Sequence, residues 1–423
     1  MPFLSTLHLS NNHLTDSLET MNCSSSSKLE TIYLSNNYLS GRILEPLSKF
    51  TNLKELYLSF QNTTGAINFF SLGFKSLELL DLSGNAISRL NPGSPNLKEL
   101  VLNNCNIEEF PTFMKNLTKL LLNSSLDALD LRSNDFQGSF PVISPRLSYV
   151  LASDNSFTGE IPLSLCNQTY LNLLNLAHNN FSGSIPRCLI ISVQDVDLGN
   201  NNLIGRLPDS FYKLGFLRTR TLDVSNNQIT GKLPRSLTNC TSLEYLNVEG
   251  NRIPDTFPFW LEELPKLKII VLRSNMFHGP IYSPQHPLSF PELRMFDISH
   301  LSRNQLSGNI PKELATLSFL AYINVSHNKI TGQIPQSTQF GGQPKSSFEG
   351  NLNLCGRLLL ESCFQDKVPS TPEAQEPEPS KQEQVFNWKA AAMGYGPGVL
   401  FDFAIGQVLY SYKPVLFFKL FRL

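Results

Sequence analysis

The side chains that could do catalytic chemistry are scattered along the chain. The seven His residues are spread out, and His178 and His327 directly precede an Asn where a turn is expected. Nucleophilic catalysis needs a Ser or Cys near a base, glycoside chemistry needs paired carboxylates, and metal binding needs Cys or His at short spacings. The sequence shows none of these patterns, so it predicts no enzyme, no cofactor and no metal site.

The elements that would position any site come from a motif that recurs about every 24 residues. Its form is Leu-x-x-Leu-x-Leu-x-x-Asn-x-Leu-x-Gly-x-Ile-Pro, and the cleanest copy runs from Leu171 to Pro186. Further copies centre on Asn37, Asn134, Asn155, Asn201, Asn227, Asn275 and Asn328, with weaker copies around Gln61, Asn85, Cys105 and Asn251. This period predicts an α/β-type leucine-rich-repeat solenoid, with short parallel strands on the concave face and loops or 3-10 turns on the convex face.

The motif has a physical logic. Alternate strand residues point inward, and each buried Leu contributes on the order of 2 kcal/mol. The Asn amide is expected to be buried and to bond the backbone of its own and the next coil. Cys105 takes this Asn position in its repeat, which favours a buried, unreactive thiol.

The outward residues between the leucines are expected to line the concave face. They mix aromatic, polar and charged side chains, which suits a peptide or protein ligand and lacks the basic stripe that nucleic acid needs. The candidates for ligand contact are Tyr33, Tyr57, Asp130, Arg132, Tyr149, Tyr245, Asn247, Glu249 and Arg273.

The cysteines and sequons are typical of a secreted chain. Seven Cys residues are too few for a disulfide scaffold, but Cys355 is expected to pair with Cys363, and Cys166 with Cys188. Cys23, Cys105 and Cys240 are expected to be free or locally buried. Glycosylation sequons occur at Asn22, Asn62, Asn116, Asn123, Asn167, Asn180, Asn239 and Asn324.

The composition changes after the repeats, which are expected to be about 14 in number and to occupy residues 1–347. A cap is predicted at 348–364, an acidic Pro/Glu-rich spacer at 365–387, a transmembrane helix at 388–411 and a short cytoplasmic tail at 412–423. Trp388 and Tyr410 flank the apolar run, and Lys413 follows it. The positive-inside rule then places the solenoid outside the cell.

The apolar run carries a helix-association pattern. Gly394, Gly398 and Gly406 recur at a four-residue spacing, so they lie on one helix face where a second helix could pack closely. Asp402 falls on the same face, and a mid-membrane carboxyl costs about 2.5–3.5 kcal/mol unless it is protonated or paired.

These segments together resemble the plant receptor-like proteins, which have extracellular leucine-rich repeats, one membrane helix and no kinase. The resemblance rests on Leu174 to Cys188, Asp255 to Trp260, Val271 to Ile281, Ser347-Phe-Glu-Gly-Asn, and the run beginning Asn387-Trp-Lys-Ala-Ala-Ala-Met-Gly. It implies perception of a peptide or microbial elicitor at the plasma membrane, as a single-pass type I protein. It also implies signalling through an adaptor receptor kinase, contacted by the repeats and the membrane helix.

Three departures from the family pattern stand out. Met1 opens inside a repeat, without a leader or an N-terminal cap. An irregular junction near 298–304 adds three residues between a strand and its Asn, where the family usually carries an island and further repeats. Asp402 and Gln407 stand where the family helix usually has Gly and His. These features indicate a truncated or mis-spliced member.

Two other functions fit parts of the sequence. A non-functional receptor fragment would explain the missing segments. A secreted repeat inhibitor of cell-wall-degrading enzymes would explain the solenoid, although such a protein needs neither the spacer nor the membrane run. The function predicted first is a kinase-less cell-surface receptor in plant defence.

Overall fold

The computed structural model describes residues 3–16, 27–40, 43–61, 67–69, 74–90, 96–107, 125–143, 145–209, 218–281, 290–299, 304–360 and 363. The chain divides into two units, Met1–Cys363 and Phe364–Leu423, and the second lies outside the described residues. The spacer, membrane run and tail predicted there therefore stay predictions. Within the described residues, no helix is long and apolar enough to cross a membrane.

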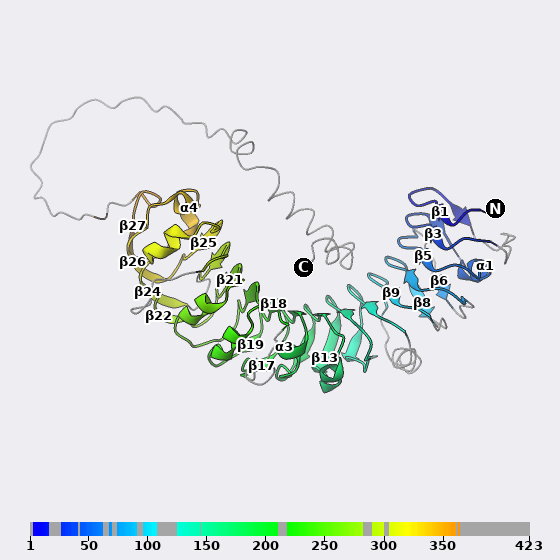
Figure 1. Ribbon diagram of the computed structural model, residues 1–423, viewed down its shortest axis with the longest axis horizontal. Coiled ribbons are helices and arrows are strands. Elements are labelled where there is room, and N and C mark those ends of the chain that lie inside the picture. Colours follow the sequence, from blue (N-terminus) through cyan, green and yellow to red (C-terminus); the bar gives the residue numbers. More distant parts are fainter. Residues whose placement is uncertain are drawn as a thin grey trace, which may run out of the picture. The chain divides into compact units, whose positions relative to one another are not determined.

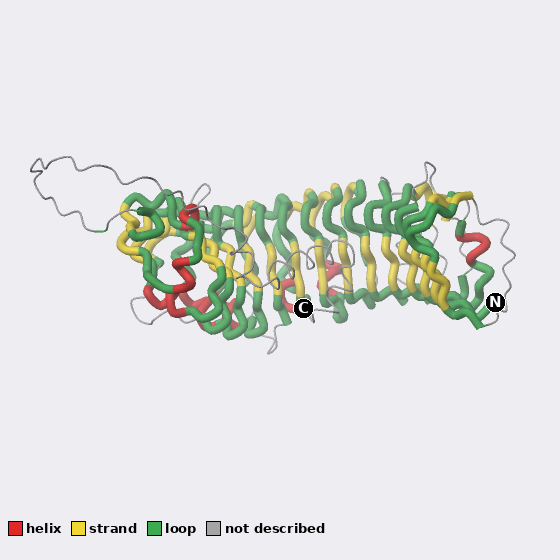
Figure 2. The backbone as a smooth tube through the Cα atoms, turned by 90° about the horizontal axis from the view of Figure 1, so that it is seen from above, coloured by secondary structure: helices red, strands yellow, loops and turns green. Residues whose placement is uncertain are grey.

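The first unit is a solenoid whose inner face is one parallel sheet, with the strands side by side along its length (Figures 1 and 2). Each strand is three residues long, and neighbouring strands pair without a register shift, so equivalent positions form continuous rows. The strands are β1 (Thr6–His8), β3 (Thr31–Tyr33), β5 (Glu55–Tyr57), β7 (Leu79–Asp81), β9 (Glu99–Val101), β10 (Ala128–Asp130), β12 (Tyr149–Leu151), β14 (Leu173–Asn175), β16 (Asp195–Asp197), β18 (Thr221–Asp223), β20 (Tyr245–Asn247), β21 (Ile269–Val271), β23 (Met295–Asp297) and β25 (Tyr322–Asn324).

A second set of strands runs along one side of the solenoid, where the sequence predicted only loops. The Asn-x-Leu-x-Gly part of the motif forms them, because its outer backbone pairs with the coil beside it. Gly183 in this part has φ 75°, and an added Cβ would lie 2.8 Å from Glu160 Cγ, so glycine is required there. These strands are β2 (Thr15–Asp16), β4 (Tyr38–Leu39), β6 (Ile67–Phe69), β8 (Ile87–Leu90), β11 (Gln137–Ser139), β13 (Ser156–Glu160), β15 (Asn180–Ser182), β17 (Ile204–Gly205), β19 (Gln228–Ile229), β22 (His278–Pro280), β24 (Gln305–Asn309), β26 (Lys329–Gln333) and β27 (Asn353–Cys355).

Short helical turns cover the convex side, as the sequence predicted. Several begin directly after a proline that caps them, because proline fixes φ and has no N–H to satisfy. The turns are α1 (Leu44–Leu47), η2 (Leu163–Asn167), α3 (Leu189–Ser192), η3 (Arg235–Asn239), η4 (Phe259–Glu263), η5 (Lys312–Thr316), α4 (Thr338–Gly341) and η6 (Lys345–Ser347).

The motif Asn residues are buried, but their side-chain amides form hydrogen bonds to the preceding coil, which the sequence did not predict. Asn179 donates to the carbonyls of Leu176 in its own coil and Ala152 in the preceding coil, at 3.2 and 2.9 Å. Its Oδ1 accepts from the amide of Phe157, also in the preceding coil, at 3.0 Å. The prediction of a hydrogen bond to the next coil is therefore wrong, because the Asn side chains bond the preceding coil.

Cys105 occupies the Asn position as predicted. Its Sγ lies 3.2 Å from the carbonyl oxygen of Leu82 in the preceding coil, which imitates the amide contact of an Asn. Burial raises the pKa of its thiol to about 12. The thiol is therefore protonated and unreactive at ordinary pH.

The junction near 298–304 keeps the Asn row intact. Asn304 donates to the carbonyl of Ile298, six residues earlier, whereas regular motif Asn residues reach back three. Its Oδ1 still accepts from the amide of Phe277 in the preceding coil at 3.0 Å. The buried bond of the Asn row is thus kept at Asn304, and residues 300–303 of the junction lie outside the described residues.

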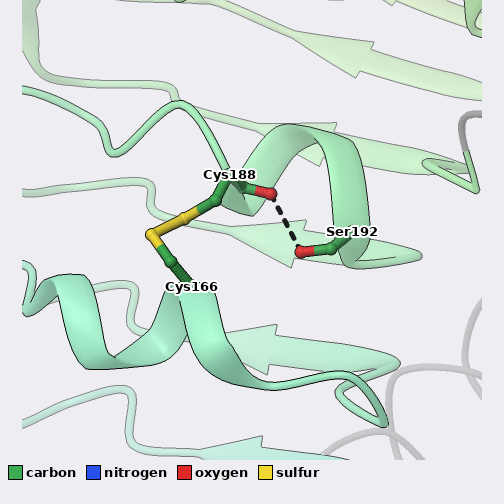
Figure 3. The surroundings of a disulfide bond; sticks show 3 residues. All are labelled: Cys166, Cys188 and Ser192. Atoms are coloured by element: carbon green, nitrogen blue, oxygen red, sulfur yellow. Dashed lines mark hydrogen bonds between the residues drawn. A yellow bond between two sulfur atoms is a disulfide. The ribbon is translucent and has the colours of Figure 1, made fainter. Parts of the chain in front are cut away.

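The predicted cysteine pairs are bonded in the structure. Cys166 in η2 and Cys188 at the start of α3 join two adjacent coils on the convex side, with Cα atoms 5.2 Å apart (Figure 3). The Cys188 carbonyl also accepts a hydrogen bond from Ser192 Oγ at 2.9 Å. Cys355 and Cys363 are bonded with the same Cα separation. Cys105 and Cys240 are buried free thiols, and Cys23 lies outside the described residues.

The last inner strand is covered by a loop rather than left as an open edge. Gln343 Oε1 accepts from the amide of Ile323 at 3.2 Å, and its Nε2 donates to the carbonyl of Ala321 at 3.0 Å. The carbonyl of Ser347 accepts from the amide of Val325 at 2.9 Å. This end of the sheet therefore has no row of free donors to recruit another strand.

Phenylalanine rings form a stack inside the middle coils. Phe136, Phe157 and Phe181 are fully buried, with ring centroids 5.7 and 6.0 Å apart. Replacing Phe181 with Ala is expected to destabilise the solenoid by about 3–5 kcal/mol, because a cavity would open between two coils. Denaturant titration of the full chain measures this. Phe319→Ala is the control, since that ring is 57% exposed, and equal losses would contradict the packing argument.

Candidate ligand-binding face

The inner sheet carries rows of outward side chains, one from each coil. The first row consists of the first residue of each inner strand, and the middle row consists of the third residue. The end row consists of the residue two positions after the end of each strand. Tyr149 and Tyr245 lie in the first row. The middle row contains Tyr33, Tyr57, Asp130 and Asn247, and the end row contains Arg132, Glu249 and Arg273. All nine predicted contact residues therefore lie on the concave face, but spread over many coils.

An aromatic stack opens the middle row at the N-terminal end. The rings of Tyr33 and Tyr57 are 4.6 Å apart and nearly parallel, and the His8 ring lies 5.0 Å from Tyr33. Burial and the nearby Glu55 raise the pKa of Tyr57, so its hydroxyl stays protonated. The sequence missed His8, although register with Tyr33 could have found it.

Asp130 and Arg132 neutralise each other. Arg132 Nη2 lies 2.9 Å from Asp130 Oδ2, and its Nε donates to Oδ1 at 3.0 Å. Both side chains are buried. From the sequence, both residues were predicted as separate ligand contacts. In the structure they form one bidentate ion pair, so their charges are already neutralised.

The centre of the face holds two carboxylates in register. Asp197 on β16 pairs with Asp223 on β18 across adjacent strands. Asp223 Oδ2 accepts from Tyr245 Oη at 3.0 Å and from Asn247 Nδ2 at 2.9 Å. Burial is the larger cause, and repulsion from Asp223 the smaller one, that together raise the pKa of Asp197 to about 7. Asp197 is thus a partly protonated group near neutral pH.

Asp197 and Asp223 were missed from the sequence, although Tyr245 and Asn247 were found. Each is the third residue of its strand, so the motif alone places both in the middle row. Their mutual effect depends on the strand spacing of about 4.8 Å, which brings like charges together. We call Asp197, Asp223, Tyr245 and Asn247 the central cluster.

Ion pairs flank the central cluster on both sides. Arg220 Nη2 lies 3.3 Å from Asp195 Oδ2, and Thr221 Oγ1 donates to Asp195 Oδ1 at 2.9 Å. Burial nevertheless raises the pKa of Asp195. Arg273 contacts Glu249 at 2.5 Å and Asp297 at 3.8 Å, and its hydrogen bond to Glu249 raises its pKa. Both flanking arginines therefore have partners, whereas the central carboxylates face each other.

The described sequons fall on different faces. Asn167, Asn180 and Asn239 are exposed, in η2, β15 and η3. Asn324 is half-buried on the inner strand β25, where its Nδ2 donates to Tyr322 Oη at 3.1 Å. Asn22, Asn62, Asn116 and Asn123 lie outside the described residues. In the part of the chain that the structure describes, no group of three or more His, Cys, Asp or Glu could hold a metal ion.

Family models and solved structures support the solenoid. Models described as leucine-rich repeat match residues 191–253 and also 28–50, 96–117 and 170–190. The solved structure PEPR1-AtPEP1 is similar with a TM-score of 0.60 at 26% identity, over 84% of this chain and 52% of that one. A plant ice-binding protein is similar with a TM-score of 0.52 at 26% identity, over 59% of this chain and 79% of that one.

Two relatives found by sequence have a higher identity to this chain than these two solved structures have. Receptor-like protein 54 of Arabidopsis thaliana is 43% identical over 592 residues, covering 100% of this chain and 74% of the relative. Receptor like protein 24 of the same plant is 36% identical, covering 98% of this chain and 67% of the relative. Because the chain has 423 residues, the longer alignment shows that the first relative has residues inside the matched span that this chain lacks. The chain belongs to the family of plant leucine-rich-repeat receptor-like proteins.

Proposed function

We propose that this chain is a kinase-less receptor that binds a peptide or protein ligand on its concave face, with the central cluster as the main anchor. The single observation behind this is the central carboxylate pair. Asp197 and Asp223 face each other without a cation among the described residues, in a face whose other described charges are largely paired. A Lys or Arg of a ligand would relieve their repulsion and would hydrogen-bond to both carboxylates.

A peptide fits this face better than a small molecule does. The rows run across many coils, and Tyr245 and the Tyr33–Tyr57 stack offer aromatic contacts at separate points along them. An extended ligand with basic and apolar residues could contact several rows at once. Plant defence is the context that the family resemblance suggests for such a ligand.

A library of random linear peptides displayed on phage tests the ligand proposal directly. Panning against the full chain should enrich basic peptides, and Asp223→Asn should weaken their binding about tenfold, because a charge-assisted contact is lost. Glu160→Gln is the control, since Glu160 is exposed on the lateral strand β13. Enrichment that is insensitive to Asp223→Asn, or absent, would contradict the proposal.

Signalling is proposed to pass through a partner receptor kinase, as the resemblance to the receptor-like proteins implies. Gly394, Gly398 and Gly406 of the predicted membrane helix at 388–411 would form part of the contact, together with the repeats. In this arrangement the spacer at 365–387 lies outside the plasma membrane and the tail at 412–423 lies inside it.

Kinase activity co-purified with the full chain from leaf-cell membranes tests this second step. Gly398→Leu should reduce the co-purified activity about fivefold, because a bulky side chain keeps the helices apart. Leu400→Ile, off that helix face, should leave it unchanged. Equal activity with both variants would remove the membrane helix from the proposed contact.

A further inference from the structure

A cavity of about 340 Å³ lies on the convex side between η3 and η4. Its charged lining residues are Lys232, Arg235 and Asp255, and its aromatic wall is Phe259 and Trp260. The volume is in the range of small-ligand pockets. The cavity is separate from the concave face, because Lys232, Leu233 and Arg235 follow the lateral strand β19, and Phe259 and Trp260 belong to the convex turn η4.

The positive charges of this cavity are available to a ligand. Lys232 and Arg235 are exposed, and no carboxylate of the described residues forms an ion pair with either one. Asp255 is turned to the backbone instead: its Oδ2 accepts from the amide of Leu233 at 3.1 Å, and its Oδ1 from the amide of Thr256 at 2.8 Å. The lining therefore carries a net positive charge that suits an anion.

The aromatic wall is held in place from behind. Phe259 and Trp260 are half-buried and pack against the hydrophobic core. Phe257 fixes Phe259 through an edge contact, with ring centroids 5.0 Å apart. Each ring thus turns one side to the core, and its remaining surface lines the cavity. A flat apolar wall next to cations favours a ring that bears an acidic group.

The backbone around the cavity has little to offer a peptide. The amides of Leu233 and Thr256 are bound to Asp255, and those of Phe259 and Leu261 are bound within η4 and its cap. Pro234 and Pro258 have no N–H. These four amides are not available to a peptide strand, whereas a sugar ring needs only side-chain contacts.

We propose that this cavity binds a uronic acid residue of an acidic polysaccharide, with its ring against Trp260 and its carboxylate at Lys232 and Arg235. A basic side chain from the preceding coil extends the site. An added Cβ on Gly231 would lie 2.7 Å from Arg206 Cγ, so the stem of Arg206 passes directly beside the segment that carries Lys232. A neighbouring uronate along the polymer would meet this third cation.

Titration of the full chain with a uronic acid trimer, measured by calorimetry, tests the proposal against its neutral methyl ester. The acid should bind about tenfold more tightly than the ester, and Arg235→Gln should weaken the acid about tenfold, because one charge-assisted contact is removed. Lys312→Gln is the matched control. Lys312 follows a capping proline in η5 as Arg235 does in η3, but it does not line this cavity.

Trp260→Leu separates stacking from charge. It should weaken the trimer while leaving the preference for acid over ester in place, because the cations remain. Equal binding of acid and ester, or equal losses in Arg235→Gln and Lys312→Gln, would overturn the site. Equally tight binding of tri-glutamate would replace the sugar with an acidic peptide. None of these results depends on the concave face, so failure here leaves the receptor proposal intact.

Discussion

Replacing Asn201 with Ala is expected to destabilise the solenoid by about 3–5 kcal/mol, near the upper end for single substitutions. Asn201 Nδ2 donates to the carbonyls of Leu176, Leu198 and Gly199 at 3.0–3.2 Å. Its Oδ1 accepts from the amide of Phe181 at 3.0 Å. Because the side chain is buried between two coils, its loss leaves several backbone groups without partners and out of reach of water.

The adjacent Asn202 provides a matched control for this prediction. Its side chain is exposed, and its backbone amide donates to the carbonyl of Phe181, a bond that Ala retains. Asn202→Ala should therefore change the free energy of unfolding by less than about 0.5 kcal/mol. Denaturant titration of both variants gives the difference. Comparable losses would mean that the Asn row does not hold the coils together.

Replacing Asp197 with Asn is expected to stabilise the solenoid at pH 8 by about 1–3 kcal/mol, allowing for partial exposure of the side chain. The pKa of Asp197 is about 7 in the folded chain, against an ordinary value of 3.8 for an aspartate. Between these values the folded protein keeps a proton that the unfolded chain releases. The contribution of Asp197 to the free energy of unfolding is thus fully present below about pH 4 and is lost as the pH rises through about 7.

The variant should remove most of this pH dependence, because an amide does not ionise. The control is Asp135→Asn, since Asp135 is an exposed carboxylate outside the inner rows. It should leave the slope of stability against pH between 4 and 7 unchanged. The same slope of stability against pH in the wild type and in Asp197→Asn would contradict the assignment of the raised pKa to Asp197.

The repeating part of the fold could be predicted from the sequence because one motif encodes it many times. The repeat period predicted the inner strands, the convex turns, the buried Asn row and the role of Cys105. The lateral strands were missed because they arise from pairing between coils, which the Asn-x-Leu-x-Gly pattern does not reveal within one repeat. The direction of the Asn bonds was missed for the same reason.

The candidate site was less predictable than the fold. The motif placed single residues on the concave face, but it did not show which of them neutralise each other. Asp130 and Arg132 cancel because they are two residues apart on one strand end. Asp197 and Asp223 interact because the register sets them side by side, at a sequence distance that varies with loop length.

Photo-cross-linking shows whether a bound peptide ligand lies on the central cluster. A basic peptide selected by panning would carry a photoreactive group beside its Lys or Arg, and would be irradiated with the full chain. Anchoring of the ligand by the central cluster should give cross-links to β16, β18 and β20 that Asp223→Asn reduces about tenfold. Cross-links confined to the convex turns, or unaffected by Asp223→Asn, would contradict it.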